Sequence, residues 1–162
     1  TGVQTCALPI FPVGIGRSET LADGGDGLVI ACGTLLGEAL RAAADLRREG
    51  LEVAVVNARF VKPLDPAIVD RIEAAPWTIT LEENALQTGF GSAVLEAVND
   101  AGIHAGPVIR LGLPDRFVEH GERGELLADL GLDAAGIAAA CRRLAGRGPA
   151  EPTTPAHASF TR

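Results

Sequence analysis

Two adjacent carboxylates, Glu82 and Glu83, directly follow a short apolar run and could work as a general acid and base. The run at residues 78–81 predicts a strand, and the carboxyl ends of strands in α/β sheets commonly carry ligand-binding groups. Neighbouring residues of a strand point to opposite faces, however, so the two carboxylates are poorly placed to cooperate. We expect one of them to cap the following loop and the other to be solvated or to meet a neighbouring domain.

Two glycines flank a phenylalanine in Gly89-Phe90-Gly91-Ser92, just before a helical pattern. Backbone N–H groups at such a helix start could bind an anion, because this end of a helix carries partial positive charge. A dinucleotide-binding fingerprint would need a third glycine where Val94 stands. Close helix packing by the glycines is therefore favoured over a nucleotide site, and Phe90 is expected to be a packing or interface residue.

Charged residues also follow Pro114. We expect Asp115 and Arg116 to form an ion pair across the interface to another domain, with a local turn bond as the alternative. His120 has no Cys, His or acidic cluster at metal-ligand spacing around it, so a domain contact is favoured over metal binding. The sequence indicates no catalytic, cofactor-binding or metal-binding residue. The residues predicted to lie at a domain or dimer interface are Glu83, Asn84, Phe90, Asp115, Arg116 and His120.

The cysteines Cys6, Cys32 and Cys141 are odd in number and far apart in the chain. Their spacing matches neither a zinc site nor a disulfide framework, which favours a reducing cytoplasm. Cys32 ends an apolar run and Cys141 lies in an alanine-rich helical pattern, so both are expected to behave as small hydrophobic residues.

Composition narrows the class of protein. The chain has 162 residues, of which 47% are apolar and only 4% aromatic, which suits a single domain with a core of Ala, Val, Leu and Ile. The formal net charge is −7 and the arginines are scattered, so a nucleic-acid partner is not expected. The chain has no apolar stretch near the roughly 20 residues that span a bilayer, and its first residues do not resemble a signal peptide. We therefore expect a cytoplasmic protein without a membrane partner.

Apolar runs and helical patterns alternate along the chain. The predicted strands lie at 13–22, 28–32, 53–56, 78–81 and 108–111, and the predicted helices at 35–49, at 67–75, from about 93 onward and at 133–145. The segment Asp23-Gly24-Gly25-Asp26 predicts a tight turn that joins the first two strands in a hairpin. This alternation predicts a three-layer α/β/α fold with a mostly parallel sheet of about five strands, whose antiparallel edge is the hairpin.

Several residues mark the expected ends of helices. Gly33-Thr34 is expected to cap the first helix at its N-terminus, and Asp65 and Asp133 are expected to cap two later helices. Gly50 stands where the residue after a helix commonly adopts a left-handed conformation.

Four stretches together resemble one enzyme family. They are Ala58-Arg59-Phe60-Val61-Lys62-Pro63-Leu64-Asp65, Glu82-Glu83-Asn84-Ala85, Gly89-Phe90-Gly91-Ser92-Ala93-Val94 and Gly112-Leu113-Pro114-Asp115-Arg116-Phe117. In their order and spacing they resemble the C-terminal domain of the 1-deoxy-D-xylulose-5-phosphate synthases, enzymes of the transketolase type. Segments 12–16 and 130–133 extend the likeness to about residues 12–145. A single stretch also resembles other transketolase relatives, but the full set resembles the synthases.

The resemblance implies a parent enzyme that uses thiamine diphosphate and Mg to join pyruvate and glyceraldehyde 3-phosphate, with loss of CO2, in isoprenoid precursor synthesis. In this family the groups that bind cofactor and substrate belong to two domains upstream of the region matched here. The resemblance therefore implies a domain that serves homodimer packing and supports those upstream domains of the same chain. Such a domain is expected to be inactive alone and to bind no cofactor.

Three alternatives remain open at this point. The domain could belong to another transketolase-family enzyme, to a 2-oxo-acid dehydrogenase β chain, or to a stand-alone interaction module. The upstream residues would decide between the two enzyme classes, and an initiation codon close to Phe11 would favour the independent module.

The two ends of the chain fall outside the resemblance. Residues 1–10 match a translated sequencing-adapter string, so we expect this segment to be non-native. Residues 11–146 are expected to form the transketolase C-terminal-like domain. Residues 147–162 are rich in Pro, Thr and Ala, with few large apolar groups, and are expected to be a disordered tail.

Overall fold

The computed structural model describes residues 13–147. Both the adapter-like segment and residues 148–162 of the expected tail lie outside the described residues, so those two predictions are not tested. The strands are β1 (Glu19–Ala22), β2 (Gly27–Cys32), β3 (Val53–Asn57), β4 (Thr78–Ala85) and β5 (Val108–Leu113). The helices are α1 (Leu36–Arg48), α2 (Pro66–Ala74), α3 (Phe90–Asp100), α4 (Arg123–Asp129) and α5 (Ala134–Leu144).

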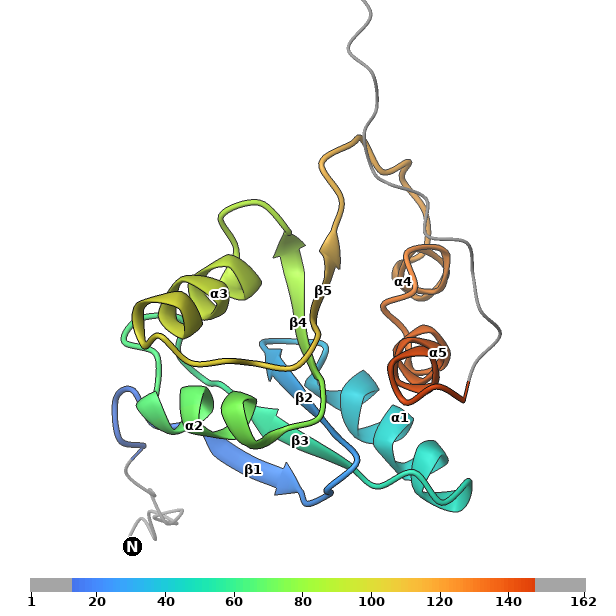
Figure 1. The fold of residues 1–162 in the computed structure, drawn as a ribbon. Coiled ribbons are helices and arrows are strands. Elements are labelled where there is room, and N and C mark those ends of the chain that lie inside the picture. Colours follow the sequence, from blue (N-terminus) through green and yellow to red (C-terminus); the bar gives the residue numbers. More distant parts are fainter. Residues whose placement is uncertain (1–12, 148–162) are drawn as a thin grey trace, which may run out of the picture.

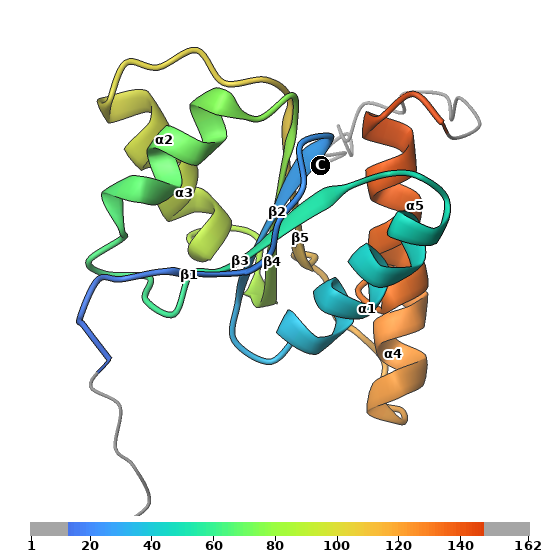
Figure 2. The ribbon, with the colours of Figure 1, turned by 90° about the horizontal axis from the view of Figure 1, so that it is seen from below.

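The strands form one sheet in the order β1-β3-β2-β4-β5 (Figure 1). β2 pairs in parallel with β3 and β4, β4 pairs in parallel with β5, and only β1 is antiparallel to its neighbour. Helices α2 and α3 cover one face of the sheet, while α1, α4 and α5 cover the other (Figure 2). The predicted three-layer fold with five strands and one antiparallel edge is confirmed.

The predicted hairpin is wrong, because β1 pairs with β3 rather than with β2. The segment between β1 and β2 instead crosses the beginning of β3. There the Asp26 N–H donates to the Glu52 carbonyl at 2.9 Å, and the Glu52 N–H donates to Asp26 Oδ2 at 2.7 Å. A Cβ on Gly24 would clash with the backbone of Glu52 and Val53. The small residues thus permit a close crossing rather than a hairpin turn.

The core has one apolar layer on each face of the sheet. Val29 and Ile30 are neighbours on β2 and therefore point to opposite faces. Val29 belongs to the layer that includes Leu46 of α1, whereas Ile30 belongs to the layer that includes Ile68 of α2 and Val94 of α3. Burial on both faces explains why the central strands are continuous apolar runs rather than alternating ones.

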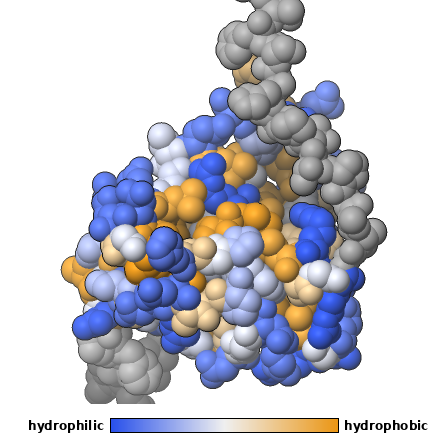
Figure 3. Space-filling model, in the orientation of Figure 1, coloured by the Kyte–Doolittle hydropathy of each residue, from blue (hydrophilic) through white to orange (hydrophobic). Residues whose placement is uncertain are grey.

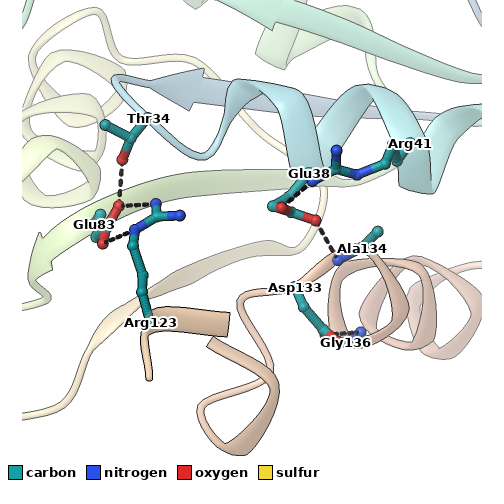
Figure 4. A network of polar contacts seen from close by, with 8 residues as sticks. All are labelled: Thr34, Glu38, Arg41, Glu83, Arg123, Asp133, Ala134 and Gly136. Carbon is teal, nitrogen blue, oxygen red and sulfur yellow. Dashed lines mark hydrogen bonds and ion pairs between the residues drawn. The ribbon is translucent and has the colours of Figure 1, made fainter. Parts of the chain in front are cut away.

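Two of the predicted helix caps are confirmed. Asp65 Oδ1 accepts a hydrogen bond from the Ala67 N–H at 3.1 Å. Asp133 Oδ1 accepts one from the Gly136 N–H at 2.8 Å, as Figure 4 shows. Gly50 follows α1 with a φ of 73°, the left-handed conformation expected there. Each of these three residues acts on backbone only a few positions away in the chain, which is why the sequence alone reveals its role.

Other expectations about element ends need correction. Thr34 does not cap α1: the N-cap residue is Leu35, no side chain caps this end, and the Thr34 hydroxyl bonds elsewhere. β4 extends through Ala85, so both carboxylates lie inside the strand rather than after it. α3 begins at Phe90, directly after the glycine turn. Helix α4 was not expected from the sequence.

Candidate functional site at the carboxyl edge of the sheet

The four parallel strands end at one edge of the sheet, which we call the carboxyl edge. It consists of the loops that follow β2, β3, β4 and β5, at residues 33–35, 58–65, 86–89 and 114–122. The loop after β5 projects beyond the rest of the sheet (Figure 1). Ligand groups in α/β folds gather at such an edge, and most of the predicted site residues lie on or beside it.

Glu82 caps the N-terminus of α3. Its side chain is buried, with the residue only 3% exposed. The Phe90 N–H donates to Glu82 Oε2 at 2.7 Å, and the Gly91 N–H donates to Glu82 Oε1 at 2.8 Å. A buried carboxylate is tolerated here because two hydrogen bonds and the positive end of the helix compensate for its lost hydration. One of the two carboxylates is thus a cap, as expected, but Glu82 caps the first turn of α3 rather than the loop before it.

The glycines of the turn allow this close approach. A Cβ on Gly89 would overlap Glu82 Oε2 and the Ala85 carbonyl, and one on Gly91 would lie too close to Thr80 and Arg110. Packing is thus the role of both glycines, as the sequence favoured. The two α3 N–H groups that an anion would need are already taken by Glu82, so the anion-site alternative does not hold in this structure.

Glu83 points to the other face of β4 and binds α4 (Figure 4). Arg123 donates to Glu83 from Nε at 3.1 Å and from Nη2 at 2.6 Å, and the Thr34 hydroxyl donates to the same carboxylate. These hydrogen bonds, first that of Arg123 and then that of Thr34, hold the pKa of Glu83 below its usual value. The opposite orientation of Glu82 and Glu83 excludes a cooperating acid–base pair.

Two hollows open on the carboxyl edge, one on each side of Glu83. The first, of about 300 Å³, lies between the ends of β2 and β4 and is lined by residues that include Thr34, Val61 and Thr88. The second, of about 340 Å³, lies beneath the loop after β5 and is lined by residues that include Val118 and His120. Glu83 lines both, so it forms the partition between them.

The other predicted interface residues lie at different depths. Asn84, Asp115, Arg116 and His120 are all exposed at the carboxyl edge. Phe90 is only 2% exposed and packs in the core between the sheet and α3, so the interface role proposed for it is wrong and only the packing role remains. Its burial follows from its place at the first turn of α3.

The predicted ion pair of Asp115 and Arg116 has no counterpart within the described residues. The Arg116 N–H donates to the Pro114 carbonyl at 2.8 Å, which closes a backbone turn. Neither charged side chain has a hydrogen bond or ion pair with any residue in 13–147. Both charges are thus presented to the surroundings of the domain, and their pairing across an interface stays a prediction.

The two cysteines in the described region are not poised for chemistry. Burial, and next the negative charge of Glu82, raises the pKa of the Cys32 thiol. Burial in the core raises the pKa of Cys141 to about 12. Both groups therefore stay protonated at neutral pH and are weak nucleophiles, as expected for small hydrophobic residues.

Asp65 fixes the point at which the chain reaches the sheet. It is 4% exposed, and the backbone N–H and hydroxyl of Ser18 donate to its Oδ2 at 2.7 and 2.9 Å. The hydrogen bond from the Ser18 N–H is the main cause of a lowered Asp65 pKa. One carboxylate thus both caps α2 and holds the segment before β1. The sequence revealed the first of these two roles only.

Sequence reasoning missed the partners of Glu83. Thr34 and Arg123 lie 49 and 40 residues away from it in the chain. In the sequence, Glu83 is only an acidic residue near the end of a strand and Arg123 an arginine at the start of a short polar segment. Neither feature identifies the partner of the other. Their meeting depends on how α4 lies beside β4.

The described residues contain no group of three or more His, Cys, Asp or Glu side chains that could hold a metal ion. Between residues 13 and 147, no helix combines the length and apolar character needed to cross a membrane.

The fold defines an open α/β domain with helices on both faces of a mostly parallel sheet. The chain belongs to the transketolase C-terminal domain family, because the model of the family described as "Transketolase, C-terminal domain" matches residues 16–137.

Comparison with curated proteins gives a more specific likeness. The chain is 50% identical over 155 residues to 1-deoxy-D-xylulose-5-phosphate synthase 1 of Geobacter sulfurreducens, a match that covers 91% of this chain and 24% of that protein. It is 48% identical over 125 residues to the synthase of Geobacillus thermodenitrificans, covering 76% of this chain and 20% of that protein. The chain thus spans about a quarter or less of these relatives.

Solved structures show the same fold. A split-gene transketolase described as an inactive beta4 tetramer matches with a TM-score of 0.76 and 29% identity, over 86% of this chain and 45% of that chain. A transketolase mutant of Pichia stipitis matches with a TM-score of 0.57 and 17% identity, over 81% of this chain and 18% of that chain, which shows likeness of fold alone.

Proposed function

We propose that this chain is the C-terminal domain of a 1-deoxy-D-xylulose-5-phosphate synthase. The observation that carries the proposal is the 50% identity over 91% of the chain to such an enzyme. The parent would join pyruvate and glyceraldehyde 3-phosphate, with release of CO2, to give 1-deoxy-D-xylulose 5-phosphate. It would act in the cytoplasm as a homodimer, in the supply of isoprenoid and thiamine precursors.

The parent's thiamine diphosphate and Mg would bind in the upstream domains. The residues of this domain do not fit that cofactor, because the donors that a diphosphate could use at the start of α3 already hold the Glu82 carboxylate. Two carboxylates near the carboxyl ends of the strands are engaged as well, Glu83 by Arg123 and Asp65 by Ser18. The residues from 13 to 147 also hold no group of three or more His, Cys, Asp or Glu side chains that could bind a metal. We therefore assign no catalytic step to this domain.

The role proposed for the domain is structural. Its well-packed sheet would support the upstream domains and contribute to dimer packing in the parent. The isolated 162-residue chain would consequently have no synthase activity.

A second candidate is supported by one observation. The split-gene transketolase structure shows that a chain containing this type of domain can be encoded apart from the rest of its enzyme. Under this alternative the domain belongs to a transketolase subunit that assembles with a separate chain. Its 29% identity, against 50% for the synthase, makes this the less favoured function.

Recovery of the complete reading frame tests the proposal. The full-length protein, supplied with thiamine diphosphate and Mg, should convert pyruvate and glyceraldehyde 3-phosphate into 1-deoxy-D-xylulose 5-phosphate, detected by mass spectrometry. The 162-residue chain at equal concentration should give none. Transfer of a two-carbon unit from a ketose phosphate, with no use of pyruvate, would instead support the transketolase alternative. Absence of any upstream coding sequence for an enzyme would remove both.

A further inference from the structure

We propose that the carboxyl edge is the face on which the upstream part of the parent chain docks, with Phe117 as its apolar anchor. The inference rests on the proposed function, because it takes the occupant to be the catalytic portion that precedes this domain in a synthase. It goes further by naming the docking face, the anchoring side chain and the residues around it.

The chain enters the domain at the carboxyl edge. β1 runs antiparallel to β3, and its first residue, Glu19, pairs with the last residue of β3, Asn57. The segment that leads into β1 therefore arrives at the carboxyl edge. Ser18 holds it there through its two hydrogen bonds to Asp65. Most of the length of the synthase relatives lies outside the match, and the family is a C-terminal domain, so upstream domains would be tethered at this edge.

Exposed apolar side chains gather at the same edge. Of the seven large apolar residues that are exposed in the described region, five lie on its loops or on the segment that leads to it. These five residues are Val13, Ile15, Val61, Phe117 and Val118. Phe117 is fully exposed, which is unusual for an aromatic residue without a partner. A protruding aromatic side chain with polar neighbours is typical of an anchor that a partner buries.

The chemistry of this edge suits an interface between domains of one chain. Such interfaces are more polar than those of obligate dimers. The apolar residues here are surrounded by exposed polar ones, among them Asn84, Thr88 and Arg116. The two hollows beside Glu83 could receive side chains of the partner. The hydrogen bonds that Thr34 and Arg123 donate to Glu83 join the loop after β2 and the start of α4 to the end of β4, and should preserve the shape of the edge.

The outer edge of β5 is the competing surface. Apolar side chains gather over β5, between α3 and the helices of the other face (Figure 3), and they include the half-buried Val108, Ile109 and Leu111. Between residues 13 and 147 no chain segment leads to this surface from upstream, and no exposed aromatic residue of that part of the chain lies on it. We therefore favour the carboxyl edge, and protection of β5 becomes an outcome that would contradict the proposal.

Amide hydrogen exchange can locate the docked face. Exchange would be measured on the 162-residue chain alone and on the full-length protein from the same gene. Amides in 58–63, 86–89 and 114–122 should exchange at least about tenfold more slowly in the full-length protein, because docking removes them from solvent. Protection confined to β5 or to α3 would overturn the proposal. So would the same protection in the isolated chain as its concentration rises, since a second copy would then be the occupant.

The substitution Phe117→Ala tests the anchor, and Leu95→Ala is its matched control on the exposed side of α3. In the full-length protein, Phe117→Ala should raise the exchange rate of the protected loops about tenfold, the loss typical of a buried aromatic anchor. Leu95→Ala should leave it unchanged. The midpoint of urea unfolding of the isolated chain should not change with Phe117→Ala, because the Phe117 side chain is fully exposed and buries no surface against the described residues. Equal exchange in both variants would remove Phe117 from the proposal, and Val118→Ala would then test the adjoining apolar residue.

The docking face and the proposed function can be refuted independently of each other. Synthase activity with no protection at the carboxyl edge would leave the function standing and refute the docking face. Protection of the carboxyl edge in a full-length protein that makes no deoxyxylulose phosphate would support the docking face and refute the proposed function.

Discussion

The two sides of β4 near its carboxyl end are built differently. On the α3 side, Glu82 is buried and both of its oxygens accept hydrogen bonds from backbone N–H groups. The packing there is so close that no side chain fits at Gly89 or Gly91. On the α4 side, the side chain of Glu83 remains 29% exposed beside two hollows, and its partner Arg123 is itself largely exposed.

The two sides of β4 therefore differ in what their residues do: one side stabilises the fold and the other forms part of the accessible surface. The Glu82 side is closed and stabilises the fold, whereas the Glu83 side is open and leaves two hollows and a charged pair accessible from outside. α4 reflects the same openness, since Leu127 is its only buried residue in the structure described. Substitutions should therefore reduce stability strongly on the first side and weakly on the second.

Glu82→Gln should have the largest effect. The amide would place an NH2 group against one of the two α3 N–H donors and would remove the charge that stabilises the helix terminus. We expect a loss of about 3 kcal/mol in the free energy of unfolding, because buried hydrogen bonds to a charged group are among the strongest in proteins. Urea unfolding followed by circular dichroism measures it. Glu96→Gln, the same change at an exposed position of α3, should alter stability by less than about 0.5 kcal/mol. Equal losses in the two variants would contradict the contrast.

Gly89→Ala should rank second. A methyl group there would press on the Glu82 carboxylate and on the Ala85 carbonyl, neither of which can move freely. We expect a loss of about 2 kcal/mol, the usual range for overpacking. Gly37→Ala is the control, because a Cβ on Gly37 meets no atom within 4 Å and a helical alanine is favoured over glycine. Thermal unfolding should show a lower midpoint for the first variant and an unchanged or higher one for the second.

The sequence revealed most of the fold because its strongest signals are local. The run 28–32 predicts a buried strand from five residues, and Asp65 and Asp133 cap helices that begin at the next residue. The hairpin failed because Gly and Asp residues suit a tight turn and a close crossing equally well. α4 was missed because it has seven residues, a glycine in its first turn and no capping side chain.

The site was harder to predict for a different reason. The sequence indicated that one of the two glutamates caps the loop, but not which one, because the face that each occupies depends on strand register. The pairing of Glu83 with Arg123 spans 40 residues and leaves no periodic trace. The sequence allowed Phe90 to be either a packing or an interface residue, because a large aromatic residue in a glycine turn can equally be buried or exposed.

Asp65→Asn should have an intermediate effect and a distinct pH dependence. Asp65 is buried like Glu82 but lies in the loop between β3 and α2 rather than in β4, so it tests whether burial alone sets the cost. At neutral pH we expect a loss of about 1 kcal/mol, the usual value of an N-cap. The folded pKa is lowered, so this stabilisation is present above the unfolded value of about 3.9 and is lost as the pH falls through the folded pKa. The difference from the unsubstituted protein should therefore shrink below about pH 4. Asp70→Asn, exposed on the same helix, should show no such change.

The smallest effect is expected where Glu83 meets Arg123. Exposed ion pairs contribute about 0.5 kcal/mol or less to folding, even with two hydrogen bonds. A double-mutant cycle with Glu83→Gln and Arg123→Ala should give a coupling energy of that size, and the coupling should weaken in high salt because solvent reaches both groups. The exposed pair of Glu49 and Arg142, also joined by two hydrogen bonds, provides a reference that lies away from β4. A coupling energy as large as the loss expected for Glu82→Gln, about 3 kcal/mol, would mean that the α4 side is as closed as the α3 side, and the contrast between the two sides would then fail.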